Sequence, residues 1–358
     1  MTDEKRPHPA SSDLARWFIL VLCSAAAAFL LAKLHFTAGL LVAPLVLAAY
    51  MAVRGWQTRV HNSLFAGAQA TIGLLMAQSL TLPVLHEITL RWPIYLLSVF
   101  AVIALSFSLG WILMRLRIMP GSTALWGSSP GAASAMTLLS SAFGADTRLV
   151  AFMLYLRVVL VVIGTSVVAR FALHPAHFHP LGGMPERLPH ADALVVPVVL
   201  VITLAASFIN FPAAAMLLGL ASGILAHMLT SAALAPSIWL LTPAYFVVGW
   251  VIGLRFTMDV VHHAARALPA VLCSSLILIG ACAALAIPVA RIAHTDWLSA
   301  YLATSPGGAD SLAIIAASSP VDMAFVMTMQ IARFIILLAV GPPLATWLAH
   351  RARHLDRP

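Results

Sequence analysis

The sequence repeats itself with a period of 176 residues, and this internal duplication constrains the fold more than any other feature. From residue 73 onward the two copies align without a gap, and the residues they share have specific backbone or charge behaviour. The identical pairs are Gly73/Gly249, Pro93/Pro269, Ser129/Ser305, Pro130/Pro306, Gly131/Gly307, Asp146/Asp322, Val150/Val326, Met153/Met329, Arg157/Arg333 and His174/His350. Duplicated apolar chains are a known plan of membrane transporters, with function placed where the halves meet. We therefore expect two homologous halves with a site between them.

Composition places the chain in a membrane. It is 61% hydrophobic and 9% charged, whereas soluble domains carry about 25% charged residues. The apolar runs are continuous rather than alternating, and their lengths suit helices that cross a hydrocarbon core of ~30 Å. The candidate spans are residues 17–33, 38–53, 62–80, 91–115, 146–172, 193–209, 211–228, 237–256, 267–290 and 322–349. The expected fold is an all-α polytopic membrane protein of about ten transmembrane helices.

A polar segment divides these spans into two groups. Residues 14–172 form the first expected transmembrane repeat, 173–192 a linker rich in His, Pro and Gly, and 193–350 the second repeat. The linker is too polar to cross a bilayer. Its four histidines lack the spacing of a zinc site, so we interpret them as part of a solvated loop. We predict neither a metal site nor a cofactor, and no enzymatic activity.

The formal charge of +8 does not indicate a nucleic-acid partner. The Lys and Arg residues lie singly or in pairs at span ends, and three of them, Arg351, Arg353 and Arg357, follow the last span. This distribution is typical of topogenic charges that remain cytoplasmic. We expect both termini on the cytoplasmic side of a membrane protein whose surroundings are the lipid bilayer. Direct DNA binding is not expected without a basic cytoplasmic module.

Each half contains one segment that a single helix cannot explain. In residues 118–145 and 294–321 a Pro-Gly pair interrupts the apolar run, and each following arm is about half a membrane long. Each segment is either a re-entrant hairpin, which gives five spans per half and inverted repeats, or a broken helix that crosses completely, which gives parallel repeats. We favour hairpins, because irregular backbone at membrane depth usually lines a cavity.

The interruption itself has the same sequence in both halves. Ser129-Pro130-Gly131 and Ser305-Pro306-Gly307 each predict a helix start, with serine as N-cap and proline in the first turn. Two helix N-termini with free N–H groups would then lie near mid-membrane, where they favour anionic groups. The alternative is that each tripeptide only forms a tightly packed turn.

Two arginines and one acid are the charged residues expected near these interruptions. Arg157 and Arg333 each lie eleven residues after an aspartate, or ~16 Å along a helix, near the bilayer centre. An unpaired arginine there costs at least ~2.5–3.5 kcal/mol, so both need interior partners. They either bind a ligand or join the halves structurally. Asp310 has Ser134 as its counterpart, and it either pairs with an arginine or binds a proton or cation.

Four further residues complete the prediction as secondary candidates. Asp146 and Asp322 are expected to be N-caps of the helices that carry the arginines. Gln330 and Tyr155 are polar residues within apolar runs. They either line the same cavity or form hydrogen bonds between helices.

The two interrupted regions resemble a known family. The segments are WGSSPGAASAMTLLSSAFGADTRLVAFMLYLRVV and YLATSPGGADSLAIIAASSPVDMAFVMTMQIARF, which resemble the paired signatures of the AbrB-type bacterial inner-membrane proteins. That family shares only its name with the small soluble AbrB DNA-binding regulators. The resemblance implies inverted repeats similar to those of ion exchangers, and a role in regulation of gene expression. The site residues it implies are Ser129, Pro130, Gly131, Asp146, Arg157, Ser305, Pro306, Gly307, Gly308, Asp310, Asp322 and Arg333.

Two functions follow from these observations. Two arginines and two positive helix ends against one acid favour a secondary-transporter-like protein for a small anionic solute, with H⁺ or Na⁺ coupling through Asp310. Such a protein would affect gene expression indirectly. The alternative is a membrane-bound regulator or sensor without transport activity. The oligomeric state has no signal in the sequence.

Overall fold

The computed structural model describes residues 10–33, 38–56, 58–119, 122–131, 133–172, 192–209, 214–230 and 234–355. Within these ranges the chain forms sixteen helices and no strand. The helices of the first half are α1 (Ala10–Lys33), α2 (Gly39–Val53), α3 (Asn62–Ala77), α4 (Leu82–Leu90), α5 (Trp92–Arg115), α6 (Thr123–Ser128), α7 (Ala133–Ala142) and α8 (Thr147–Ala172). Those of the second half are α9 (Asp192–Ser207), α10 (Ala214–Thr230), α11 (Ile238–Gly253), α12 (Met258–Ala264), α13 (Leu268–Ala293), α14 (Trp297–Thr304), α15 (Ala309–Ala317) and α16 (Met323–Leu355). The predicted all-helical class is confirmed.

Equivalent helices begin at equivalent positions. The first residues of α3, α5, α7 and α8, shifted by 176, are the first residues of α11, α13, α15 and α16. The expected spans coincide with helices; the largest differences are at α1, which begins at Ala10 rather than at residue 17, and at α16, which continues to Leu355. The linker at 173–192 lies outside the described residues, except for Asp192 at the start of α9.

Several helices are long and apolar enough to cross a membrane. Within the described chain these are α1, α5, α8, α13 and α16, and the bent pair α11–α12, with an angle of 50°, is a sixth candidate. The helices α2, α9 and α10 are apolar but shorter. This arrangement is consistent with a polytopic membrane protein.

The two halves interlock through a matched pair of glycines. Gly73 on α3 packs against the backbone of α10, where an added Cβ would lie 2.2 Å from the carbonyl oxygen of Met216. Gly249 on α11 packs in the same way against α2, where a Cβ would lie 2.9 Å from the carbonyl oxygen of Leu41. Only glycine permits such close helix approach, which is common in membrane proteins. The third helix of each half therefore packs against the second helix of the other half.

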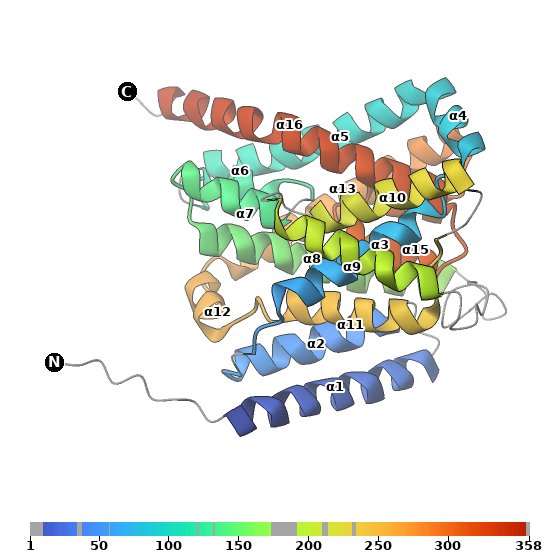
Figure 1. The fold of residues 1–358 in the computed structure, drawn as a ribbon. Coiled ribbons are helices and arrows are strands. Elements are labelled where there is room, and N and C mark those ends of the chain that lie inside the picture. Colours follow the sequence, from blue (N-terminus) through green and yellow to red (C-terminus); the bar gives the residue numbers. More distant parts are fainter. Residues whose placement is uncertain are drawn as a thin grey trace.

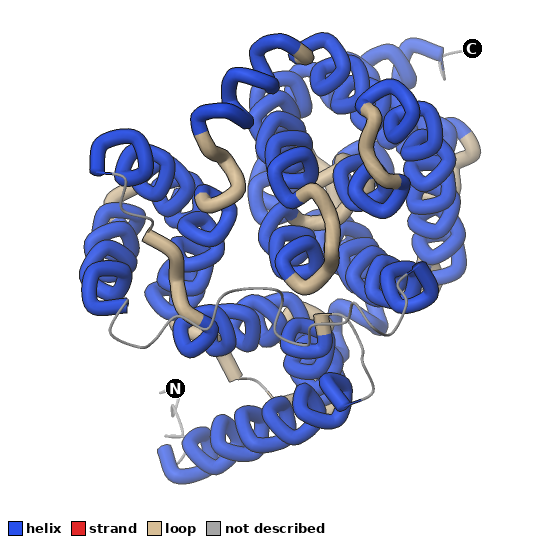
Figure 2. Tube along the Cα trace, turned by 90° about the vertical axis from the view of Figure 1, so that its right-hand side faces the viewer, coloured by secondary structure: helices blue, strands red, loops and turns tan. Residues whose placement is uncertain are grey.

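Equivalent short helices lie at opposite ends of the molecule. With the long helices running across the view, α4 lies at the right end and α12 at the left, and α6 and α7 lie to the left while α15 lies to the right (Figure 1). The start of α1 and the end of α16 both lie at the left end. Viewed from the side, most of these helices are seen end-on as a bundle (Figure 2). We call the left end the terminus side.

Candidate site at the two helix breaks

Each Ser-Pro-Gly tripeptide separates two short helices, but the serines are not N-caps. Ser129 and Ser305 are the C-caps of α6 and α14, with φ/ψ of −57°/133° and −58°/134°. The prediction of a serine N-cap was wrong, because the residue before proline is forced into extended backbone and ends the preceding helix. The N-cap of α15 is Gly308, three residues later. The corresponding position in the first half, residue 132, lies outside the described residues.

The two arginines form hydrogen bonds with the carbonyl ends of the preceding short helices. Arg157 is 3% exposed; its guanidinium donates to the carbonyl oxygen of Ser128 at 2.9 Å and also to that of Ser129. Its Nε has no hydrogen-bond partner among the described residues. A helix C-terminus carries partial negative charge and unpaired carbonyls, so it stabilises a cation there. This arrangement explains how a buried arginine is tolerated on α8.

Arg333 repeats this geometry in the second half with one added partner. It is 3% exposed, and it donates to the carbonyl oxygens of Ser305 at 2.6 Å and Gly307 at 3.0 Å. Gln330, one turn earlier on α16, accepts a further hydrogen bond from it and donates to the carbonyl oxygen of Leu302 at 2.7 Å. Gln330 therefore fixes the orientation of the guanidinium. Its first-half counterpart is Leu154.

Asp310 is not the partner of either arginine among the described residues. Its carboxylate accepts from the backbone N–H of Ser311 at 2.9 Å, within the first turn of α15. Gly308 leaves the room that this carboxylate occupies, since a Cβ there would lie 2.7 Å from its oxygen. Of the two alternatives for Asp310, the pair with an arginine is not formed among the described residues, because Arg333 donates instead to the carbonyl oxygens of Ser305 and Gly307 and to Gln330.

The two breaks meet at the centre of the molecule. Gly131 adopts φ +115°, and a Cβ on it would lie 3.8 Å from both the Nε of Arg333 and the carbonyl oxygen of Gly307. Gly307 in turn lies against Val161 of α8, where a Cβ would approach to 2.9 Å. Arg157 and Arg333 are close enough for their charges to repel each other. The structure thus gathers Ser129, Pro130, Gly131, Arg157, Ser305, Pro306, Gly307, Gly308 and Arg333 into one region, with Gln330 beside Arg333.

Residues that the sequence did not reveal also lie in this region. Cys282 on α13 is fully buried and within electrostatic range of both arginines. Its counterpart is Ser106 on α5. Among the described residues the hydroxyl of Ser106, like those of the predicted Ser129 and Ser305, is buried without a hydrogen-bond partner. A cavity of about 10 Å³, the size of one water, borders Arg157 and is lined also by Ser128, Ser274 and Ser275. Small residues in apolar runs give no sequence signal of such a role.

Asp146 and Asp322 are N-caps, as predicted. Asp146 accepts from the backbone N–H of Leu149 at 3.1 Å, and Asp322 from that of Phe325 at 2.9 Å. Their own N–H groups donate to the equivalent hydroxyls of Thr123 and Ser299, at 3.1 and 2.8 Å. These bonds attach the start of α8 and α16 to the short helices α6 and α14, and so position each arginine relative to its break.

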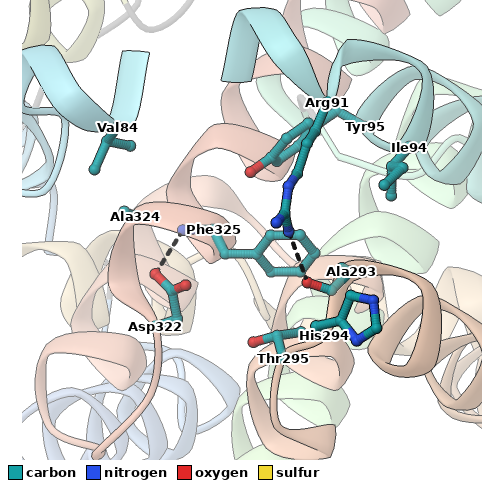
Figure 3. A pocket seen from close by; sticks show the side chains of 10 residues that line it. All are labelled: Val84, Arg91, Ile94, Tyr95, Ala293, His294, Thr295, Asp322, Ala324 and Phe325. Atoms are coloured by element: carbon teal, nitrogen blue, oxygen red, sulfur yellow. Dashed lines mark hydrogen bonds between the residues drawn. The ribbon is translucent and has the colours of Figure 1, made fainter. Parts of the chain in front are cut away.

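A larger cavity opens at the end opposite the termini. It has a volume of about 290 Å³ and lies between α4, α5, the end of α13 and the start of α16. Figure 3 shows Arg91 pointing to the carbonyl oxygen of Ala293, at 3.3 Å, with Asp322 on the other side of Phe325. Its lining includes an arginine, an aspartate and His294, so its charge is mixed. Tyr155 lies in neither cavity; it contacts Arg255 on the terminus side.

Comparisons with known proteins match most of the length of the chain. The model of a family described as "Transition state regulatory protein AbrB" matches residues 48–349. The chain belongs to the AbrB family. It is 35% identical over 338 residues to a "Putative regulator AbrB" of Escherichia coli (strain K12), covering 93% of this chain and 97% of that protein. It is 25% identical over 359 residues to a protein named YhjN of Bacillus subtilis (strain 168), covering 93% of each. The all-helical fold separates this AbrB-family chain from the soluble AbrB DNA-binding regulators.

Proposed function

We propose that this AbrB-family protein is a secondary-transporter-like membrane protein for a small anionic solute, and that it influences gene expression indirectly. The observation that supports this most is the pair of buried guanidinium groups where the two breaks meet. Within the described chain neither Arg157 nor Arg333 has a carboxylate partner. A helix C-terminus offsets at most about half a charge. The region keeps a positive excess, which an anion would neutralise.

The proposed topology has ten crossings in two inverted repeats, each with a re-entrant hairpin. In support, α6 contacts α7 and α14 contacts α15, as the arms of a hairpin do. Equivalent short helices lie at opposite ends of the molecule (Figure 1). Inverted repeats around irregular backbone are the plan of many secondary transporters. The start of α1 and the end of α16 lie at the same end (Figure 1), and the surplus of Lys and Arg supports the proposal that this end faces the cytoplasm across the bacterial inner membrane.

Asp310 is the proposed coupling residue for H⁺ or Na⁺. It is half-buried, lies in the first turn of α15 beside the second break, and has no arginine partner among the described residues. Intramembrane acids in such positions are typical of proton and cation relays. We propose neither covalent catalysis nor direct contact with nucleic acid, because the residues at the breaks supply positive charge and shape the backbone.

Transport is tested by comparing metabolites inside and outside cells that express the wild type or the variants Arg157→Gln and Arg333→Gln. We expect an anionic metabolite to change its distribution with the wild type and not with either variant. Arg115→Gln is the matched control, since Arg115 stacks on Trp111 at the exposed end of α5. Transport of anions by both variants at the wild-type rate would refute the proposal.

A regulator or sensor without transport is the second candidate. The E. coli relative is named a putative regulator, and the cavity beside Arg157 holds only about one water. Transcript profiles of the same variants separate the two functions. An expression change that persists in a variant without flux would favour the sensor.

A further inference from the structure

A third cavity, which lies on the terminus side, has the chemistry of a binding site. It has a volume of about 200 Å³ and lies between α7, α8 and the bend that joins α11 to α12. Its lining residues are Thr137, Thr147, Arg148, Ala151, Phe152, Tyr155, Arg255, Phe256 and Val260. Both halves of the chain therefore contribute to it. The residues at the two helix breaks do not line it.

The floor of this cavity is a cluster of buried aromatic rings. Tyr155 is 7% exposed, and Phe152 and Phe256 are buried with their ring centroids 6.1 Å apart in an edge-on contact. The guanidinium carbon of Arg255 lies 5.4 Å from the centre of the Tyr155 ring. A guanidinium held over a ring face is oriented by it, and its remaining N–H groups stay available for a carboxylate or phosphate.

Both charged residues that line the cavity in the described part of the chain are arginines. Arg148 and Arg255 are both exposed, and neither forms an ion pair within the part of the chain that the structure describes. The neighbouring acid, Asp146, is already bonded to His263 at 2.6 Å and to two backbone N–H groups. Two guanidinium groups on one cavity favour a bidentate anion.

The duplication supplies an internal comparison that argues for a specific role. The positions equivalent to Arg148, Tyr155 and Arg255 are Ala324, Ile331 and Ser79. The fold has Ala324 and Ile331 at these places in the second half and Ser79 at the equivalent place in the first, so it does not itself require the arginines or the tyrosine ring. If the two arginines served only to orient the protein in the membrane, lysines would do so equally well, and no aromatic rings would be needed next to them.

We propose that this cavity binds a small organic acid, with a carboxylate between Arg148 and Arg255 and an aromatic or other apolar body on the rings of Phe152, Tyr155 and Phe256. Pockets for drug-sized molecules usually have ~300–1,000 Å³, so this one suits a smaller ligand. This site would define the class of solute in the proposed function, and its assignment to a solute rests on that function. The cavity lies next to α7, which follows the first break. In the proposed topology it is therefore a binding site on the cytoplasmic side of the two breaks.

The test is equilibrium dialysis of radiolabelled benzoate against the full chain in phosphatidylcholine nanodiscs, with benzamide as the neutral analogue. We expect saturable benzoate binding and at least tenfold weaker binding of benzamide. Arg148→Lys and Arg255→Lys keep the charge but lose the planar fork, and each should weaken benzoate binding at least tenfold. Arg54→Lys is the matched control, because Arg54 stacks on Tyr50 at 5.1 Å but does not line the cavity. Equal binding of benzamide, or unchanged binding by both lysine variants, would overturn the proposal.

Two further arms exclude other ligands and misfolding. If inorganic phosphate competes as strongly as unlabelled benzoate, the proposed contact between the rings and an apolar part of the ligand is refuted. If benzoate binding is lost in phosphatidylglycerol nanodiscs, the cavity is assigned to a lipid headgroup. Arg148→Ala, Arg255→Ser and Phe256→Leu introduce the residues of the other half, which folds with them. These variants should elute as the wild type does in size-exclusion chromatography and bind benzoate at least tenfold more weakly. Arg157→Gln should lose flux and still bind benzoate. Benzoate binding by a wild-type protein that shows no flux would retain this site and refute only transport.

Discussion

Gly131 of the first break lies against Arg333 of the second, so the two halves meet through a residue without a side chain. A Cβ on Gly131 would lie 3.8 Å from the Nε of Arg333, an ordinary contact distance, and its φ of +115° is open almost only to glycine. Glycine is thus required at position 131 by its backbone conformation, whereas its counterpart Gly307 is required by the close approach of Val161, 2.9 Å from where a Cβ would lie.

Gly131→Ala should therefore destabilise the protein by about 1–3 kcal/mol through backbone strain rather than through a clash. The measurement is the temperature of half-aggregation in detergent. Gly164→Ala on α8 is the control, because a Cβ there meets no atom within 4 Å and its backbone is helical. Alanine is the better helix former, so this variant should be neutral or stabilised by up to ~1 kcal/mol. Equal stability of the two variants would contradict the strain at Gly131.

Gln330→Leu should convert the second half to the arrangement of the first, where Leu154 occupies this position. The change removes one acceptor for Arg333 and the bond to the carbonyl oxygen of Leu302. Since Arg333 keeps its bonds to Ser305 and Gly307, we expect folded protein with a loss of about 1–3 kcal/mol. Chemical unfolding compared with the wild type measures it. Complete failure to fold would show that Gln330 has a role absent from the first half.

The sequence-level predictions succeeded where the membrane imposes length. A helix has to cover ~30 Å of hydrocarbon, so the apolar runs identified α5, α8 and α13 almost to the residue. The duplicated aspartates also had a clear meaning, because an acid before an apolar run is an N-cap signal, and Asp146 and Asp322 cap α8 and α16.

The predictions failed where backbone atoms supply the chemistry. Serine before proline is compatible with both a helix start and a helix end, and the extended backbone of Ser305 decided for the end. The partners of Arg333 are carbonyl oxygens, which every residue has, so no pattern could distinguish them from Asp310. Cys282 was missed because a small residue in an apolar run looks like packing.

Cys282 should report the positive charge between the arginines. It is fully buried on α13, within range of Arg157 and Arg333. In a variant with Cys23 and Cys273 replaced by alanine, we expect a small anionic methanethiosulfonate to react faster than a cationic one, because the local charge attracts it. Mass spectrometry measures the two rates. The preference should fall in Arg333→Gln, and a preference for the cationic reagent in the parent would contradict a positive centre.

The bond between Asp146 and His263 predicts an acid-sensitive contribution to stability. The two side chains lie 2.6 Å apart and join the N-terminus of α8 to α12. Burial raises the pKa of the Asp146 carboxyl, but the hydrogen bond and charge of His263, with the N–H groups of Leu149 and Arg148, outweigh it, so the pKa lies below its ordinary value of 3.8. The folded state then binds fewer protons than the unfolded state. Its contribution is present above pH 3.8 and is lost as pH falls through the lower folded-state pKa.

His263→Gln and Asp146→Asn separate this contact from the helix cap, which asparagine can still provide. Because the pair is partly exposed, we expect a loss below about 1 kcal/mol near neutral pH. Scanning fluorimetry of both variants and the wild type between pH 7 and pH 3 measures it. The gap between the wild type and Asp146→Asn should narrow below pH 4, because protonation removes the carboxylate that the variant lacks. A gap of constant size down to pH 3 would mean that the carboxylate charge adds nothing to the attachment of α12.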